Sequence, residues 1–233
     1  MPLWPGGVVA PFAASDCFFC RLPGYTAPHT LGTGGDQDRG RTVAPCVNEP
    51  GGRSCEQESA LMTEASIRPA EQTDAVPLGA ALGDQRYFED RLTRQAKGLG
   101  VLFTAWRGRT PVGALYLWLE DAEEPPIRGH LPGVPLLTHL EVLPDQRNRG
   151  IGAALVRAVE RHLADHGHAR GALAVRTDNT RAARLYRRLG YRDWGHGTVV
   201  CYSERTLPDG RTVSEPERCH VLVKGLPPVI RQR

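Results

Sequence analysis

The chain has 233 residues, of which 40% are hydrophobic and 24% charged, and its mean hydropathy is -0.36. This length allows one full domain with residues left over, and not two domains of ordinary size. Because no run of about 18 apolar residues occurs and no secretory signal opens the chain, we expect a cytoplasmic protein with no membrane contact. The net charge of +3 comes from interspersed acids and bases, which argues against a nucleic-acid partner.

The six cysteines do not predict a disulfide framework in a chain of this length. Cys17 and Cys20 have the two-residue gap of a zinc knuckle, but the next cysteines, Cys46 and Cys55, do not form a second close pair. We therefore expect reduced thiols and no bound metal. Zinc binding through Cys17 and Cys20 is the alternative.

Residues 1–62 differ in composition from the rest of the chain, because prolines and paired glycines recur through them and no apolar periodicity survives. Breakers at this density predict a disordered extension. Met62 is the next methionine after Met1, so the alternative is a spurious leader with the native start at Met62. The folded domain is expected over residues 63–227, followed by a short tail at 228–233.

Regular patterns begin at Ser66. Strands are predicted over 66–68, 101–106, 111–119, 135–143 and 172–175, and helices over 74–82, 86–97, 150–166 and 181–189. Residues 120–132 are acidic and interrupted by prolines, so they predict a loop. Residues 191–225 predict two or three antiparallel strands around the turn at 208–210. In the strand 135–143, alternation places Thr138, Leu140 and Val142 on one face and His139 and Glu141 on the other.

This order of elements predicts an α/β (α+β) fold. We expect a mixed, mostly antiparallel, twisted sheet flanked by helices, in which one strand–helix–strand crossover is parallel. The helix from Gly150 to His166 has the clearest apolar stripe in the chain and ends at Gly167.

A glycine-bearing turn joins the strand 135–143 to this helix. The first N–H groups of a helix have no partner inside it, and Gly150 and Gly152 let a phosphate approach the main chain closely. Arg147 and Arg149 add positive charge. The spacing alone is a weak signal in a chain rich in arginine and glycine, but its place between a strand and a strong helix favours an anion site. An ordinary helix start with solvated arginines is the alternative.

On these residues, the chain from about 63 to 225 resembles the GCN5-related N-acetyltransferase (GNAT) superfamily. The resemblance rests on Gln146/Arg147-x-x-Gly150-x-Gly152 as the acetyl-coenzyme A (acetyl-CoA) motif and on Asn179-x6-Tyr186 downstream. It implies a GNAT-like sheet and direct transfer of an acetyl group from the thioester to an amine of a small molecule or peptide. Acetyl-CoA would be the cosubstrate, and no metal would be needed.

The resemblance also assigns roles to individual residues. Asn179 would reach the pantetheine arm, or only cap its helix. Tyr186 would be the general acid, or only part of a packed helical stripe. The N–H of Val142 would be an oxyanion donor. Contacts to the cofactor are implied for Leu140, Glu141, Val142, Arg147, Asn148, Arg149, Gly150, Ile151, Gly152 and Ala153.

The general base is not evident, because the positions where relatives carry a carboxylate, around Leu136 and 173–175, are apolar here. Glu141, His139, Glu120 and Glu123 are the candidates, and a water chain is the alternative. Four carboxylates within 120–124 would favour a cationic acceptor. A solvated acidic loop is the other interpretation.

The sequence leaves the activity, the role of the arginine-rich helix and the oligomeric state open. A non-catalytic coenzyme A-binding module is the alternative to an enzyme. The arginines of the helix 181–189 are expected to be a solvated face, with one edge near the 3′-phosphate of the cofactor, and a nucleic-acid surface is the alternative. The sequence does not decide between a monomer and a homodimer.

Overall fold

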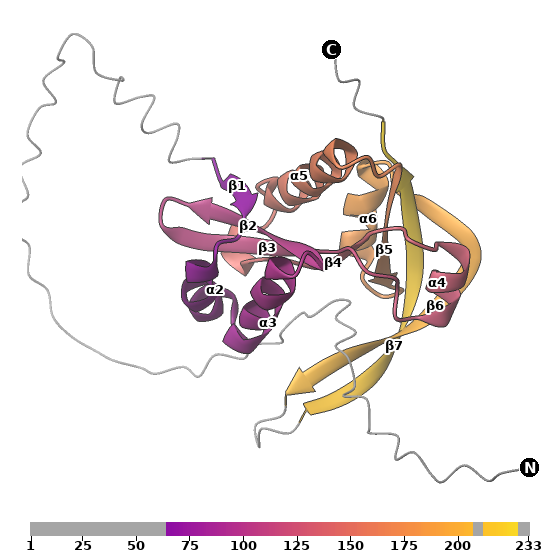
Figure 1. Cartoon of the computed structure of the whole chain (residues 1–233), viewed down its shortest axis with the longest axis horizontal. Helices are drawn as coiled ribbons and strands as arrows, with labels where there is room; N and C mark the ends of the chain where they lie inside the picture. Colours follow the sequence, from indigo (N-terminus) through magenta and orange to yellow (C-terminus); the bar gives the residue numbers. More distant parts are fainter. Residues whose placement is uncertain (1–63, 207–211, 228–233) are drawn as a thin grey trace, which may run out of the picture.

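The computed structural model describes residues 64–206 and 212–227 (Figure 1). The extension 1–62 with its zinc alternative, the turn at 208–210 and the tail 228–233 lie outside the described residues. Within the described part, no helix is long and apolar enough to cross a membrane.

The described residues form one seven-stranded sheet in the order β1-β2-β3-β4-β5-β7-β6. The strands are β1 (Ser66–Pro69), β2 (Gly100–Arg107), β3 (Thr110–Trp118), β4 (Leu136–Val142), β5 (Arg170–Arg176), β6 (Arg192–Thr206) and β7 (Thr212–Gly225). All neighbours are antiparallel except β4 and β5, which are parallel. The predicted fold class and the single parallel crossover are therefore confirmed.

Helices cover both faces of this sheet. They are η1 (Gln72–Asp74), α2 (Ala75–Leu82), α3 (Gln85–Ala96), α4 (Pro125–His130), η2 (Pro144–Gln146), α5 (Ile151–Asp165) and α6 (Thr180–Arg188). Figure 1 shows α2 and α3 on the side of the sheet opposite to α5. Leu78 and Phe88 belong to the core on the α2 and α3 side, whereas Leu155 and Val159 belong to the core beneath α5.

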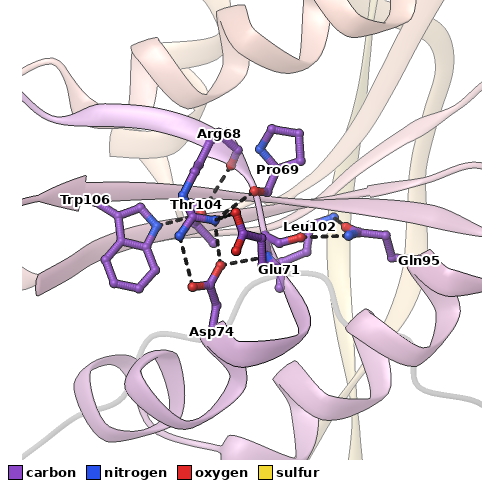
Figure 2. A network of polar contacts seen from close by, with 9 residues as sticks. Arg68, Pro69, Glu71, Asp74, Gln95, Leu102, Thr104 and Trp106 are labelled. Atoms are coloured by element: carbon purple, nitrogen blue, oxygen red, sulfur yellow. Dashed lines mark hydrogen bonds and ion pairs between the residues drawn. The ribbon is translucent and has the colours of Figure 1, made fainter. Parts of the chain in front are cut away.

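A polar network fastens the first strand to the rest of the domain (Figure 2). Arg68 of β1 donates to both carboxylate oxygens of Asp74, at 2.7 and 3.0 Å. Asp74 also accepts from the Glu71 amide at 2.7 Å. Gln95 of α3 accepts from the Leu102 amide of β2 at 2.8 Å. These contacts join β1, η1, β2 and α3, so α3 is held in a fixed position over the sheet.

One predicted loop contains a helix. Residues 120–132 were expected to be irregular because of their prolines, but Pro125 and Pro126 begin α4. Proline is compatible with the first turn of a helix, where its missing N–H would have no partner in any case.

The strand β4 carries a β-bulge. Opposite β3, Ala114 pairs with Glu141 and Tyr116 pairs with Thr138, so two residues of β4 stand opposite the single residue between Ala114 and Tyr116. His139 has a φ of +51°, in the left-handed region that is uncommon for residues other than glycine. The bulge therefore interrupts the alternation of side chains at His139.

Because of this bulge, the side chains of β4 face the two sides of the sheet in a different order from the one predicted. Thr138 stands opposite Tyr116, which belongs to the core on the α3 side, and its hydroxyl donates to the Tyr116 carbonyl at 3.2 Å. Leu140 and Val142 pack against the core on the α5 side. The prediction that Thr138, Leu140 and Val142 share a face was wrong, because the extra residue reverses the alternation after Thr138.

Candidate active site

The strands β4 and β5 separate soon after they meet. Each has seven residues, yet they pair only at Leu136 and Ala172. Beyond that pair, the edge of β4 from Thr138 to Val142 has no registered partner in β5. An unpaired strand edge offers backbone N–H and C=O groups to an extended ligand.

The Val142 amide points to this unpaired edge. On the other side of β4, the amide of Leu143 donates to the Val112 carbonyl of β3 at 3.0 Å. Because N–H directions alternate along a strand, the N–H of Val142 faces β5. The Val142 carbonyl, which also lies on that edge, accepts from Nε of Arg147 at 2.9 Å.

The turn before α5 has an unusual backbone. Asn148 and Gly150 have φ values of +63° and +82°. Apart from the two chain neighbours of Gly150, no described residue has an atom within 4 Å of where a Cβ on Gly150 would be, so the space above this turn is open. Asn148, Arg149 and Gly150 are exposed, and Arg147 is half-buried.

The start of α5 differs from the starts of α3 and α6. The Asp84 side chain accepts from an amide of α3, and the Asn179 side chain accepts from an amide of α6. Among the described residues no side chain caps α5, whose first internal hydrogen bond runs from the Ala154 amide to the Gly150 carbonyl at 2.9 Å. The amides of residues 151–153 therefore precede the internal ladder, as an anion site at a helix start requires. This arrangement fits a diphosphate.

Asn179 caps α6 and Tyr186 lies within it, and Arg181 of this helix contacts Asn148 of the turn. The Asn179 side-chain oxygen accepts from the Ala182 amide at 3.1 Å, so the capping role is present. This cap leaves the side-chain NH₂ group as a donor. Tyr186 is buried, and its ring lies edge-on to Tyr191 with centroids 5.9 Å apart. Its packing role is thus also present, and neither observation conflicts with the roles implied by the resemblance.

On the α3 side of β4, two candidate bases contact each other. Nε2 of His139 lies 3.4 Å from a carboxylate oxygen of Glu141, and the two side chains are 6% and 12% exposed. The His139 ring packs on the ring of Tyr87 from α3, with centroids 4.1 Å apart. Burial raises the pKa of the Tyr87 phenol well above its usual range, so this phenol stays protonated.

Two features near the site had no clear signal in the sequence. The first is Tyr87, which resembles an ordinary core residue of an amphipathic helix. The second is Arg176 at the end of β5, whose Nη1 lies 3.1 Å from Oε1 of Glu217 in β7 and whose Nη2 lies 2.5 Å from Oδ2 of Asp178. The hydrogen bond from Arg176 lowers the pKa of the Asp178 carboxyl. Glu217 lies 41 positions from Arg176, and only the sheet order brings the two together.

The acidic residues before α4 are held by internal contacts. Glu120 forms an ion pair with Arg94 of α3. Asp121 accepts from the Gly133 amide at 3.1 Å, and Glu124 is buried. Three of the four carboxylates are thus paired or buried, which favours a structural role over an open acidic surface. In the described part of the chain, no group of three or more His, Cys, Asp or Glu side chains could hold a metal ion.

Comparison with known proteins identifies the family. The model of the acetyltransferase (GNAT) family matches residues 66–191, which is more than half of the chain. The chain belongs to the GNAT family. The match spans β1 to α6 and includes the turn before α5, and membership makes the protein an N-acetyltransferase.

Solved structures share the GNAT fold. The ribosomal-protein-S18-alanine N-acetyltransferase of Escherichia coli is 18% identical, with a TM-score of 0.50 over 72% of this chain and 98% of that chain. The ribosomal-protein-alanine N-acetyltransferase of Brucella melitensis is 17% identical, with a TM-score of 0.53 over 69% of this chain and 99% of that chain. At these identities, the likeness shows the fold alone.

One curated relative matches a short segment. The mycothiol acetyltransferase of Clavibacter sepedonicus is 48% identical over 54 residues, which are 23% of this chain and 18% of that protein. The chain therefore matches less than a fifth of this relative's length.

Proposed function

We propose that this protein transfers the acetyl group of acetyl-CoA directly to an amine of a small molecule or peptide in the cytoplasm. The observation that carries the proposal is the start of α5, which has no side-chain cap and lies beside the unpaired edge of β4. Together these two features provide an anion site and a place for an extended ligand arm.

The cofactor would be held mainly by backbone groups. The amides from Asn148 to Ala153 would bind the diphosphate, and Arg147 and Arg149 would add positive charge. The edge of β4 from Leu140 to Val142 would pair with the amides of the pantetheine arm, which Asn179 would contact through its NH₂ group.

Two groups of the chain would then assist the transfer. The Val142 N–H, which faces the unpaired edge, would donate to the acetyl oxygen as negative charge develops on it. The Tyr186 hydroxyl would give a proton to the departing sulfur. Proximity would supply a large part of the rate, because the amine and the thioester are held together.

The names of similar proteins guide the choice of acceptors to test. Two solved neighbours are named for an alanine of ribosomal proteins, and the curated relative is named for mycothiol. These names support testing both peptide amines and small-molecule amines. The paired carboxylates before α4 give no support to selection of a cationic acceptor by that loop.

The test begins with thermal unfolding of the full chain with and without acetyl-CoA. A ligand at about 100 times its Kd adds about 2.7 kcal/mol, which raises the melting temperature by about 5–10 °C in a domain of this size. Release of coenzyme A is then measured with a panel of peptide and small-molecule amines. An unchanged melting temperature would overturn the proposal. Stabilisation without release for any amine would indicate a non-catalytic coenzyme A-binding module.

A further inference from the structure

We infer that Glu141 is the general base, held in place by His139. This inference rests on the proposed function, because a base is needed only if an amine is acetylated. An amine that arrives as an ammonium ion must lose a proton before its nitrogen can attack a thioester. The apolar residues at the positions where relatives carry a carboxylate leave this step without an evident group.

The bulge places Glu141 next to the reacting edge. Glu141 stands opposite Ala114, whose side chain belongs to the core on the α3 side, so its carboxylate projects from that face. It directly precedes Val142, whose N–H points to the unpaired edge. Successive residues of a strand are about 3.3 Å apart along its axis. The carboxylate therefore projects from the α3 face of β4 at the residue next to the proposed oxyanion donor.

The contacts of His139 explain how Glu141 is positioned. Nε2 of His139 lies 3.4 Å from the carboxylate, and the Tyr87 ring packs on the His139 ring. The backbone of His139 is in the left-handed region, which is unfavourable for a residue with a side chain. Such strain persists where surrounding contacts impose it, and it is concentrated at functional sites. His139 is accordingly a positioning residue.

Other carboxylates are less suited to this role. Glu120 is paired with Arg94, and Glu217 is paired with Arg176. Glu123 lies before α4 and outside β4. On the α3 side of the sheet, Glu141 contacts His139 and interacts electrostatically with Tyr87 of α3, which in turn interacts with Arg91 of α3 and Tyr116 of β3. Arg176 of β5 and Glu217 of β7 are paired with each other.

The proton balance of the reaction is then complete. Glu141 takes one proton from the ammonium group, and the freed nitrogen forms a bond to the acetyl carbon while the carbon–sulfur bond breaks. Tyr186 gives its proton to the sulfur, and the second proton of the amine restores the phenol. Glu141 returns its proton to solvent, so one proton is released for each amide formed.

The test compares the wild type with Glu141→Gln by the pH dependence of kcat/KM, using an alkylamine that the wild type acetylates. With the base present, kcat/KM should be flat through neutral pH, because the enzyme accepts the ammonium form. Without it, only the neutral amine reacts, so kcat/KM should fall about 10²-fold at pH 7 and rise about tenfold per pH unit. Glu89→Gln, on the exposed face of α3, is the matched control and should follow the wild type.

The outcomes separate the two proposals. If the wild type releases no coenzyme A with any amine, the proposed function fails and the base fails with it. If the wild type is active and Glu141→Gln has a parallel pH profile, the base alone is overturned. Acetyl-CoA should raise the melting temperature of Glu141→Gln as it does for the wild type, which excludes a folding defect.

A second variant tests the role of His139. Asparagine tolerates the left-handed backbone, so His139→Asn keeps the bulge but removes the ring. We expect kcat to fall about tenfold and the KM for acetyl-CoA to stay unchanged. The acidic limb of the kcat/KM profile against pH should also change. A purely structural role would instead lower the melting temperature and leave the shape of the profile unchanged, and that result would overturn the positioning role.

Discussion

Arg181, in the first turn of α6, donates through Nη2 to the side-chain oxygen of Asn148 at 2.8 Å. This contact joins the turn before α5 to the helix that carries Tyr186. The two helices also pack closely, since a Cβ on Gly152 would lie 3.4 Å from the Leu185 side chain. The two sequence motifs, about 30 residues apart, are therefore in direct contact beside the edge of β4.

The first prediction concerns Gly150, whose φ of +82° disfavours any residue with a Cβ. Gly150→Val should lower the stability by about 1–2 kcal/mol and abolish the stabilisation by acetyl-CoA, because both the turn and the approach to the amides change. Gly108→Val is the matched control, since Gly108 has a φ of +57° and equally open surroundings but lies in the turn between β2 and β3.

Thermal melts with and without acetyl-CoA separate these two effects. Gly108→Val should lose stability yet keep the full shift with acetyl-CoA. If Gly150→Val keeps the shift as well, the turn before α5 does not hold the cofactor.

The second prediction concerns the two buried tyrosines that meet edge-on. Tyr186→Phe should lower kcat by about 10²-fold to 10⁴-fold, with little change in the binding of acetyl-CoA, because only the proton donor is lost. Tyr191→Phe is the control, because it removes the hydroxyl of a second buried tyrosine that has no proposed role in the transfer. Burial raises the pKa of this phenol, and Glu160 lies near it. Steady-state kinetics should show normal kcat for Tyr191→Phe. Equal kcat for Tyr186→Phe and the wild type would leave Tyr186 with packing alone.

The sequence predicted the helices and strands well where their periodicity was strong. The helix expected over 150–166 is α5, at Ile151–Asp165, and the helix expected over 86–97 is α3, at Gln85–Ala96. The buried face of α5 is a continuous apolar stripe that matches the period of a helix, and α3 is followed by glycines at 98 and 100 that mark its end. The turn before α5 could be found for a similar reason, because its glycines stand between two strong elements.

The contacts on the α3 side of β4 could not be predicted in the same way. The bulge at His139 could not be found from the sequence, because the extra residue of β4 is visible only opposite β3, in the register of the paired strands. Tyr87 reaches His139 from another element, and Glu217 reaches Arg176 across the sheet. Such contacts depend on the strand order and on the placement of α3, which no local pattern encodes.

The third prediction concerns the acidic residues before α4. Replacing Glu120 by Gln should leave the acceptor KM unchanged, because the carboxylate is already paired with Arg94. The variant should lose about 0.2–1 kcal/mol of stability, as expected for a partly exposed ion pair. Urea unfolding and acceptor KM values across several amines give the two readouts. A rise in KM confined to cationic acceptors would show that this carboxylate attracts them after all.

The fourth prediction concerns the pH dependence of stability at the pair Arg68 and Asp74. Burial raises the pKa of Asp74, but the hydrogen bonds from Arg68 and the Glu71 amide, with the charge of Arg68, outweigh it and lower the pKa overall. A carboxyl with a lowered folded-state pKa stabilises the fold above its unfolded pKa, about 3.9, and this contribution is lost as pH falls through the folded value.

Asp74→Asn should therefore be less stable than the wild type by about 1–3 kcal/mol at pH 7, with a difference that narrows below about pH 4. Glu71→Gln is the control, because the Glu71 side chain is 73% exposed and lies 4.0 Å from Arg68, so its loss should cost little. Urea unfolding of the three proteins at both pH values measures these differences. If the stability difference between the wild type and Asp74→Asn does not change with pH, the negative charge of Asp74 contributes nothing. The side chain would then stabilise the network of Figure 2 only through its packing and its uncharged hydrogen bonds.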